Sequence, residues 1–389
     1  METVEPLEEV IDLIKETGGE AFKFCYECGL CDSVCPWNRV RDFSMRKIVR
    51  QAMFGLTEIE NEEIWRCTSC GRCPQRCPRG VDQIAIGVSA RRIATEFGVF
   101  PDPVRPIRAV SASLTGEGNP LNEERKKRAD WTEGLGVKTF TEEMEILYFP
   151  GCYPSYDPRI KKVAVATANI LKRAGVDFGI LGSKENCCGE SIRKTGNEEL
   201  FKTLARENIK TFVENGVTKI LVSSPHCYHT FKNEYAEFKV NFEVVHISQF
   251  LSELVSEGRL ELNQECGKAV TYHDPCYLGR HNGIYDEPRE TLNRIPGLEL
   301  IEMPDSLEDS LCCGGGGGRI WMETPRGERF SDLRVEQAID VGAEVLVTCC
   351  PYCIANFEDS RLTLDVTEKI EIKDITEMIQ ESIMGTEET

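Results

Sequence analysis

Residues 25–36 read CYECGLCDSVCP, and residues 67–78 read CTSCGRCPQRCP. Each stretch spaces four cysteines as C-x2-C-x2-C-x3-C and ends in proline. This spacing is typical of paired [4Fe–4S] clusters, in which three close thiolates bind one cluster and the fourth binds the other. The two stretches therefore predict two such clusters, with the ligand sets Cys25, Cys28, Cys31, Cys77 and Cys67, Cys70, Cys73, Cys35.

Zinc and disulfides are the competing interpretations of these cysteines. C-x2-C pairs also form tetrahedral zinc sites, but two complete copies of the four-cysteine spacing, each closed by proline, favour iron. A disulfide framework fits less well, because the chain shows neither a signal-peptide pattern at its start nor a run of eighteen apolar residues. In a reducing compartment, dense cysteine usage indicates metal or redox chemistry. We expect a cytoplasmic chain that reaches a membrane only through a partner protein.

Length and charge narrow the class of protein further. A chain of 389 residues is expected to form two or three domains, each able to bury its own core. Its 65 acidic residues outnumber its 46 basic ones and produce a formal charge of −19. Such a balance repels nucleic acid and anionic lipid at long range, although solubility alone also explains it. We therefore expect no nucleic-acid partner.

The first two segments differ in pattern. Residues 1–100 show helical spacing of apolar residues before, between and after the cysteine runs, with a last helix from about Val81 to Gly98. This pattern predicts an α-helical ferredoxin domain with two [4Fe–4S] clusters. Residues 101–144 contain four prolines and a charge run and show no sustained periodicity, so we expect a linker.

From residue 145 onward the sequence repeats itself. Residues 145–263 and 264–389 each contain an apolar strand that ends in a cysteine, a Cys-Cys-Gly triplet, and a second strand that ends near a further cysteine. Strands that alternate with helices predict parallel sheets with ligands at the carboxyl ends of the strands. The whole chain is thus expected to be an α+β multidomain protein, with the helical ferredoxin domain followed by two α/β repeats.

The second repeat carries a complete set of five thiols. A simple cube needs four ligands, so a fifth implies an unusual cluster or a spare ligand. The pentaglycine Gly314–Gly318 follows directly, and Gly314 and Gly315 are expected to approach the cluster and direct backbone amides at sulfur. A phosphate loop is the alternative, but the spaced glycines of that motif are absent. The five thiols are Cys276, Cys312, Cys313, Cys350 and Cys353.

The first repeat lacks one of these thiols. When the repeats are aligned on Pro225 and Pro351, Ser224 stands at the position of Cys350. A serine hydroxyl is a hard donor, whereas iron in these clusters is bound by soft thiolates. The four remaining thiols leave open a cube, a modified cluster or no cluster. They are Cys152, Cys187, Cys188 and Cys227.

Residues 46–82, RKIVRQAMFGLTEIENEEIWRCTSCGRCPQRCPRGVD, together with the two C…CCG…C-x-x-C repeats, resemble the D-type subunit of heterodisulfide reductase. Proteins of this type are a fusion of a C-type ferredoxin and a B-type catalytic subunit with two cysteine-rich (CCG) domains. The resemblance implies a non-cubane [4Fe–4S] cluster in the second repeat. In the family, two such clusters divide a disulfide between them, and Ser224 departs from that pattern.

The resemblance also implies partners. Similar proteins serve beside flavoproteins, as iron-sulfur subunits of glycolate, lactate and glycerol-3-phosphate dehydrogenases. D-type homologues also occur inside bifurcating complexes such as class II benzoyl-CoA reductase. The expected partners are therefore flavoprotein or other redox subunits within a larger complex.

Four of the five histidines lie within five residues of a repeat cysteine, and His226 and His273 are the candidates for catalysis. Disulfide cleavage consumes protons, which imidazole can deliver near neutral pH. The alternative is that these rings hold the cluster loops by hydrogen bonds. Cys349 and Cys266 stand outside the repeat pattern; Cys349 adjoins Cys350 and could exchange with it as a ligand.

Two functions remain open. In the first, electrons enter at the ferredoxin clusters and pass to the second repeat, where they reduce a disulfide substrate. In the second, the same clusters relay electrons to or from a flavoprotein or quinone-reducing partner and contact no substrate. Ser224 favours the second function, the electron relay, whereas the complete set of five thiols in the second repeat is compatible with reduction of a disulfide.

Overall fold

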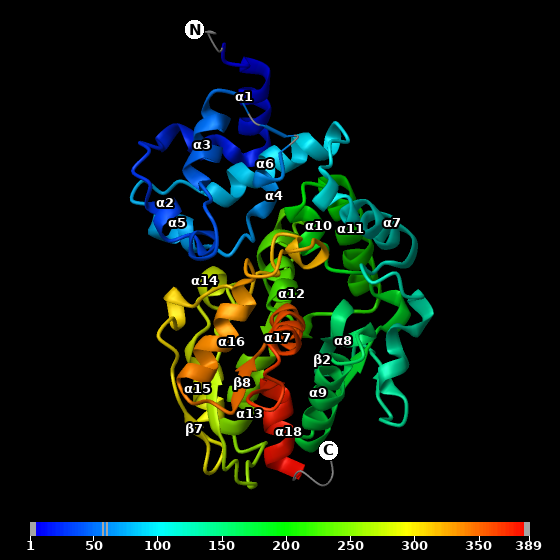
Figure 1. Ribbon diagram of the computed structural model, residues 1–389. Coiled ribbons are helices and arrows are strands. Elements are labelled where there is room, and N and C mark those ends of the chain that lie inside the picture. Colours follow the sequence, from blue (N-terminus) through cyan, green and yellow to red (C-terminus); the bar gives the residue numbers. More distant parts are fainter. Residues whose placement is uncertain (1–4, 57, 60, 385–389) are drawn as a thin grey trace.

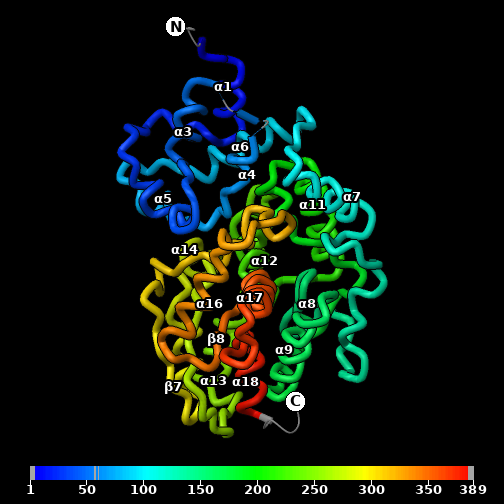
Figure 2. Tube along the Cα trace, viewed as in Figure 1, coloured from blue at the N-terminus to red at the C-terminus, as the bar shows by residue number. Residues whose placement is uncertain are grey.

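The computed structural model describes residues 5–56, 58–59 and 61–384 and arranges them in three successive parts (Figure 1). A helical part at the top of the view is followed by two parts that each contain a parallel sheet. The tube view shows the same path, with the second sheet-containing part running from yellow to red (Figure 2). The predicted mixture of a helical domain and two parallel α/β repeats is therefore confirmed.

The helical part surrounds the two cysteine runs. The predicted last helix is α6, which begins after Asp82; the Asp82 side chain accepts hydrogen bonds from the amides of Ile84 and Ala85. The helix ends before Gly98, whose φ of 69° lies in the left-handed region. The helices are α1 (Glu8–Ile14), α2 (Leu30–Ser33), α3 (Met45–Met53), α4 (Glu63–Arg66), α5 (Arg72–Arg76) and α6 (Gln83–Glu96).

The segment 101–144 is more regular than its sequence indicated. It contains α7 (Pro106–Glu117), with proline in the first turn and Gly118 at the end in the left-handed region. The buried residues Ile107, Val110 and Leu114 lie three and four positions apart, which is a helical pattern that the prolines obscured. The expectation of a stretch without sustained periodicity was wrong here, because one short apolar stripe suffices when it packs against a neighbouring domain.

The first sheet is five-stranded and entirely parallel, in the order β1-β3-β2-β4-β5. Its edge strand β1 (Lys138–Thr139) comes from the segment that precedes the first repeat and pairs with β3. The other strands are β2 (Ile146–Phe149), β3 (Phe178–Ile180), β4 (Lys219–Val222) and β5 (Glu243–His246). The helices are α8 (Cys152–Tyr156), α9 (Lys161–Arg173), α10 (Glu190–Lys194), α11 (Glu198–Glu214), α12 (Pro225–His229) and α13 (Ile247–Ser256).

The second sheet has four parallel strands in the order β7-β6-β8-β9. Its central pair β6-β8 corresponds to the pair β2-β4 of the first sheet. The strands are β6 (Ala269–Tyr272), β7 (Glu299–Leu300), β8 (Val345–Thr348) and β9 (Glu371–Asp374). The helices are α14 (Gly279–Asn282), α15 (Asp286–Leu292), α16 (Phe330–Asp340), α17 (Pro351–Thr363) and α18 (Ile375–Met384).

The last helices of the two repeats cross over to the other repeat. Helix α13 of the first repeat packs on α15, and α18 of the second repeat packs on α9. Ile375, Met378 and Ile379 recur at helical spacing along α18 and are buried, so this last helix packs into the core. The two repeats therefore share one interior.

Asp374, at the end of β9, is a buried carboxyl that predicts a pH dependence of stability. Its Oδ1 accepts hydrogen bonds from Thr376, whereas its buried Oδ2 has no partner, and burial raises its pKa from 3.8 to about 7. The unfolded chain ionises Asp374 at lower pH than the folded chain does, so the free energy of unfolding falls as the pH rises from about 4 to 7. Asp374→Asn is expected to flatten this dependence and to add about 1–3 kcal/mol at pH 7.5.

Anaerobic urea unfolding between pH 5.5 and 8 measures this effect. The exposed Asp365, replaced by asparagine, is the matched control and is expected to leave the pH profile unchanged. A profile for Asp374→Asn that still falls between pH 5.5 and 7 would show that another group titrates there.

Candidate functional site

The first cysteine run forms a site with the last cysteine of the second run. One cavity is lined by Cys25, Cys28, Cys31 and Cys77, which we call the first ferredoxin site. The amide of Glu27 donates a hydrogen bond to the Sγ atom of Cys25 over 3.4 Å, and the amide of Val81 donates to Cys77 over 3.4 Å. Glu27 has a φ of 61°, which turns its amide back toward the sulfur. Cys28 is exposed, so this site reaches the surface.

The complementary set, Cys67, Cys70, Cys73 and Cys35, is the second ferredoxin site. Burial and the thiolates of Cys70 and Cys67 raise the pKa of Cys35, which places that sulfur beside the second run. Burial, then Cys67, Cys70 and Cys35, also raise the pKa of Cys73. Ser69 repeats the backbone of Glu27, with a φ of 49° and an amide that donates to Cys67 Sγ over 3.4 Å. The chain thus brings together the crossed sets that the spacing predicted.

The five thiols of the second repeat lie together and are all buried; we call them the repeat-2 site. The amide of Gly314 donates to Cys312 Sγ over 3.3 Å, and a hydrogen bond from the amide of Gly315 helps to lower the pKa of Cys313. A hydrogen bond with Cys312 and burial raise the pKa of Cys276. Gly314 and Gly315 therefore direct amides at sulfur, as their positions predicted. A cavity of about 160 Å³ opens beside Cys313.

The rest of the pentaglycine has a role that the sequence did not indicate. A Cβ atom on Gly316 or Gly317 would collide with the carbonyl oxygen of Thr68 or Cys67. Only glycine allows this approach, by which the repeat-2 loop packs on the backbone of the second ferredoxin site. Cys312 Sγ also lies 3.7 Å from Thr68 Oγ1. The two sites are therefore in direct contact.

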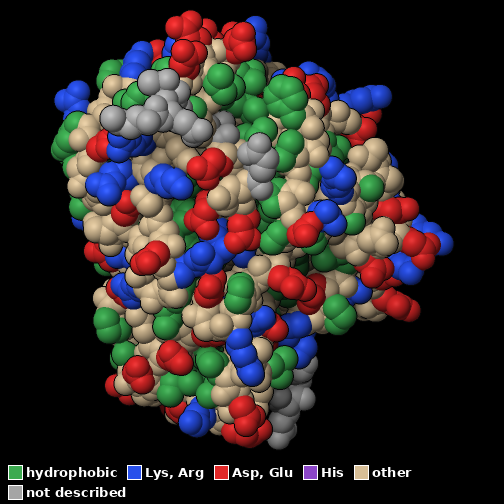
Figure 3. Space-filling view, turned by 45° about the horizontal axis from the view of Figure 1, so that its top comes forward, with side chains coloured by type: hydrophobic (Ala, Val, Ile, Leu, Met, Phe, Trp, Pro, Cys, Tyr) green, Lys and Arg blue, Asp and Glu red, His purple; other side chains and the backbone are tan. Residues whose placement is uncertain are grey.

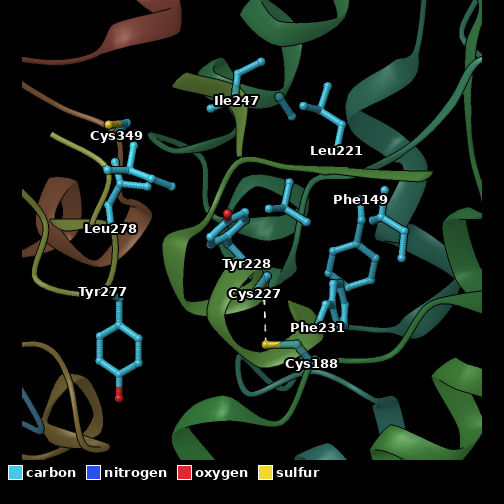
Figure 4. Close-up of a cluster of buried hydrophobic side chains, with 14 of the residues drawn as sticks. Phe149, Cys188, Leu221, Cys227, Tyr228, Phe231, Ile247, Tyr277, Leu278 and Cys349 are labelled. Carbon is cyan, nitrogen blue, oxygen red and sulfur yellow. Dashed lines mark hydrogen bonds between the residues drawn. The ribbon is translucent and has the colours of Figure 1, made fainter. Parts of the chain in front are cut away.

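The four thiols of the first repeat, the repeat-1 site, line a small cavity of about 30 Å³ together with Ser224. Cys188 Sγ and Cys227 Sγ lie 3.4 Å apart, close to the buried rings of Tyr228 and Phe231 (Figure 4). Ser224 stands directly before Pro225 at the start of α12, as Cys350 stands before Pro351 at the start of α17. The structure therefore places Ser224 where the aligned repeats put it, as the counterpart of Cys350.

A buried arginine from outside the repeats reaches the repeat-1 site. Arg128 Nη1 donates to Cys152 Sγ over 3.7 Å, and its Nε donates to Glu185 Oε2 over 3.1 Å. The side chains of Arg128 and Glu185 are both 1% exposed. Arg128 is hard to recognise in the sequence because it lies in the charge run 123–130, which is mostly exposed. The one signal was Trp131, an aromatic residue that directly follows this run and is also buried.

His226 lies between the two repeats. Its Nδ1 is 3.0 Å from Glu190 Oε2. Burial opposes its charge, but Glu190 and Cys350 raise its pKa to about 10. Its ring stacks on Tyr277, which in turn stacks on His281 and lies 3.0 Å from Ser69 Oγ. This column connects both repeats with the helical part.

His273, the second histidine candidate, has both ring nitrogens engaged. Its Nε2 is 3.4 Å from Cys353 Sγ, and its Nδ1 accepts a hydrogen bond from Arg334 over 3.1 Å. Burial lowers its pKa well below the ordinary value. The contacts of His226 and of His273 hold each ring in place, and a catalytic role for either histidine stays a prediction.

The two remaining cysteines are Cys349, which adjoins Cys350 of the repeat-2 site, and Cys266. Cys349 is fully buried, and its Sγ is 2.7 Å from the hydroxyl of Tyr272 (Figure 4 shows its place beside Leu278). Cys266 is half-buried and packs at the edge of the core.

The geometry fits clusters better than single ions. A zinc ion needs its ligand atoms within about 2.3 Å of one point. In residues 5–384, apart from 57 and 60, no three His, Cys, Asp or Glu side chains converge on one such point. Four cysteines instead line one small cavity at the first ferredoxin site and another at the repeat-1 site, and each of the four sites has a thiol that accepts a backbone amide hydrogen bond, as cluster thiolates do. The same part of the chain contains no helix long and apolar enough to span a bilayer.

The surface of the helical part is mixed in character. Figure 3 turns this end toward the viewer and shows apolar side chains among charges of both signs. Six exposed large apolar residues belong to its described portion, namely Leu7, Phe24, Tyr26, Leu30, Phe54 and Phe97.

Comparisons with known families agree with the three-part organisation. Residues 146–232 and 270–358 match the cysteine-rich (CCG) domain, and residues 21–81 match a 4Fe-4S dicluster domain. The D-type subunit of dihydromethanophenazine:CoB–CoM heterodisulfide reductase from Methanosarcina mazei is 30% identical over 390 residues, which cover 92% of this chain and 93% of that relative.

Two longer proteins are also similar. The probable iron-sulfur-binding oxidoreductase FadF of Bacillus subtilis is 38% identical over 85% of this chain, and the EtfAB:quinone oxidoreductase of Syntrophomonas wolfei is 36% identical over 82%. The chain spans about half the length of these two relatives, 48% and 46% respectively. A crystal structure of a hypothetical protein from Helicobacter pylori shares the fold, with a TM-score of 0.51, 11% identity and coverage of 97% of this chain and 73% of the other.

Proposed function

Because the chain belongs to the family of D-type heterodisulfide reductase subunits and is an iron-sulfur oxidoreductase, we propose that it relays electrons between a redox partner and its repeat-2 site. The observation that carries this proposal is the contact between two sites from distant parts of the chain. Gly316 and Gly317 pack on the backbone of Thr68 and Cys67, and Cys312 Sγ of the repeat-2 site lies 3.7 Å from Thr68 Oγ1.

The residues fit the clusters in number, type and surroundings. The first and second ferredoxin sites each supply four thiols and would hold one [4Fe–4S] cluster apiece, and the repeat-2 site supplies five and would hold the non-cubane kind. Bound clusters of this class supply one-electron oxidation and reduction. The chain's own residues order the sites, since Cys28 is exposed whereas the second site lies against Gly316 and Gly317. Electrons are therefore proposed to enter or leave the protein at the first ferredoxin site, which reaches the surface.

The partner is proposed to be a flavoprotein or another redox subunit of a larger complex. The Syntrophomonas wolfei relative is named an EtfAB:quinone oxidoreductase, that is, an enzyme that acts between an electron-transferring flavoprotein and quinone. Reduction of a disulfide is the second candidate function, and one observation favours it: a cavity of about 160 Å³ is lined in part by Cys313, a thiol of the repeat-2 site. The first repeat argues for the relay, because Ser224 leaves its site with four thiols.

The two functions are separated by turnover and iron content. A relay, purified anaerobically, is expected to pass electrons from a reduced viologen dye to a flavoprotein acceptor and to oxidise no dye when only a disulfide is added. About eight irons per chain would mean the ferredoxin clusters alone, about twelve one further cluster, and about sixteen both. Dye oxidation driven by a disulfide would replace the relay with the reductase, and fewer than about eight irons would overturn both functions.

Ser224→Cys tests the repeat-1 site in the same preparation. If four thiols already hold a cluster there, the iron content stays at about sixteen; if the site is empty only for want of the fifth thiol, the iron content rises by about four. A rise would leave the relay intact and show that Ser224 alone disables the first repeat.

A further inference from the structure

Two arginines lie buried or partly buried where the second ferredoxin site meets the repeat-2 site, and among the described residues neither is paired with a carboxylate. They are Arg91 on α6 and Arg280 on α14. Most arginines in this acidic protein have such a partner; Arg159, for example, binds Glu358 and Glu377. A buried guanidinium without a counter-charge costs several kcal/mol, so each is expected to face a negative charge of another kind.

Arg91 is 1% exposed and donates only to carbonyl oxygens. Its Nη2 donates to Cys67 over 2.7 Å and its Nε to Ile64 over 2.8 Å. Its Nη1 donates to Lys194 of the first repeat over 2.9 Å and to Gly317 of the second over 3.0 Å. This one side chain therefore joins all three parts of the molecule next to Cys67.

Arg280 bridges the same two sites from the other side. Its Nε donates to the carbonyl of Cys70 over 2.8 Å, and its Nη1 donates to the carbonyl of Ser310 over 2.6 Å. Its Nη2 is buried without a hydrogen-bond partner. These hydrogen bonds hold the guanidinium of Arg280 between Cys70 of the second ferredoxin site and Ser310, two residues before Cys312 of the repeat-2 site.

The first ferredoxin site has no comparable charge among the residues that line its cavity. Arg46 and Arg79 are there, but Arg79 is exposed, and Arg46 is 47% exposed and lies 3.6 Å from Asp32. Water and the carboxylate screen these charges, whereas the buried guanidinium groups act through a medium of low dielectric constant.

We infer that Arg91 and Arg280 are positioning residues that stabilise added negative charge at the junction, so that the second ferredoxin site has the higher reduction potential of the two ferredoxin sites. The inference rests on the proposed function. Reduction adds one electron to a site, and a nearby fixed positive charge makes that addition more favourable. An electron shared between the two ferredoxin sites therefore resides mainly at the second, next to the repeat-2 site.

Potentiometric titration monitored by electron paramagnetic resonance tests this inference, with the first ferredoxin site as the internal reference. Arg280→Gln is expected to lower the reduction equilibrium constant of the second ferredoxin site at least tenfold, a shift of about 59 mV for one electron. Arg280→Lys keeps the charge and is expected to restore most of the potential. Arg91→Gln is expected to act in the same direction; should it fail to fold, Arg280→Gln and Arg280→Lys decide alone.

Arg159→Gln is the matched control. It also removes contacts between the two repeats, but the charge of Arg159 is balanced by the carboxylates of Glu358 and Glu377. It is expected to lower stability and to leave both potentials unchanged. An unchanged potential in Arg280→Gln at full iron content would overturn the inference and leave the proposed relay standing. Equal losses in the glutamine and lysine variants would also overturn it, since shape and not charge would then be the cause.

Discussion

Cys73→Ser is expected to remove about four irons per chain and to slow electron transfer from the ferredoxin part to the repeat-2 site at least hundredfold. Cys73 belongs to the second ferredoxin site, where Cys67, Cys70 and Cys35 act on its pKa. Loss of an outer-shell partner alone costs about 10–100-fold in metal affinity or activity, so loss of a ligand is expected to cost at least as much. Serine supplies a hard oxygen in place of a soft thiolate.

Iron and acid-labile sulfide assays, with stopped-flow reduction of the repeat-2 site, measure this result. Cys266→Ser is the matched control, because Cys266 is half-buried and lies at none of the four sites. This control is expected to retain the full iron content and the original rate of electron transfer to the repeat-2 site. Should Cys73→Ser retain its iron and transfer electrons at the original rate, the second ferredoxin site is not on the route.

Glu185→Gln is expected to lower the free energy of unfolding by about 3–5 kcal/mol, the usual cost of leaving a buried charge without its partner. Glu185 and Arg128 are both 1% exposed, and Glu185 Oε2 accepts the Nε hydrogen bond of Arg128. Glutamine keeps the acceptor for the amide of Leu181, which Glu185 Oε1 binds over 3.1 Å. The loss therefore reports on charge and not on shape.

The double variant Arg128→Met, Glu185→Gln is expected to recover most of the stability, since no buried charge remains. Anaerobic urea unfolding of the two single variants and the double variant completes the cycle. Glu124→Gln, at an exposed pair with Lys126, is the control and is expected to change nothing measurable. A double variant as unstable as Glu185→Gln would mean that the arginine is not the source of the loss.

Local chemistry was readable from the sequence. The crossed ligand sets followed from a spacing that is rigid over twelve residues, and the parallel sheets followed from apolar strands between helices. The equivalence of Ser224 and Cys350 needed only the prolines that follow them. Each of these features depends on neighbours along the chain, which a sequence displays directly.

The features that were missed depend on contacts between distant segments. Arg91, Arg128 and Arg280 look like ordinary surface arginines until the fold buries them. Helix α7 was hidden by prolines, although its apolar stripe is buried and the helix contacts the short helix Arg319–Trp321 of the second repeat. The tight packing of Gly316 on Thr68 is invisible without the helical part in place. Composition and periodicity carry no information about which surfaces meet.

Backbone packed on backbone also has a mechanical consequence. Side chains at an interface can change rotamer and allow the two surfaces to slide, but the contact of Gly316 and Gly317 with Thr68 and Cys67 has no such freedom. In the proposed relay, the span between the second ferredoxin site and the repeat-2 site is therefore expected to stay constant. Internal electron transfer is then expected to need no gating motion, and its rate to be independent of the viscosity of the surrounding solvent.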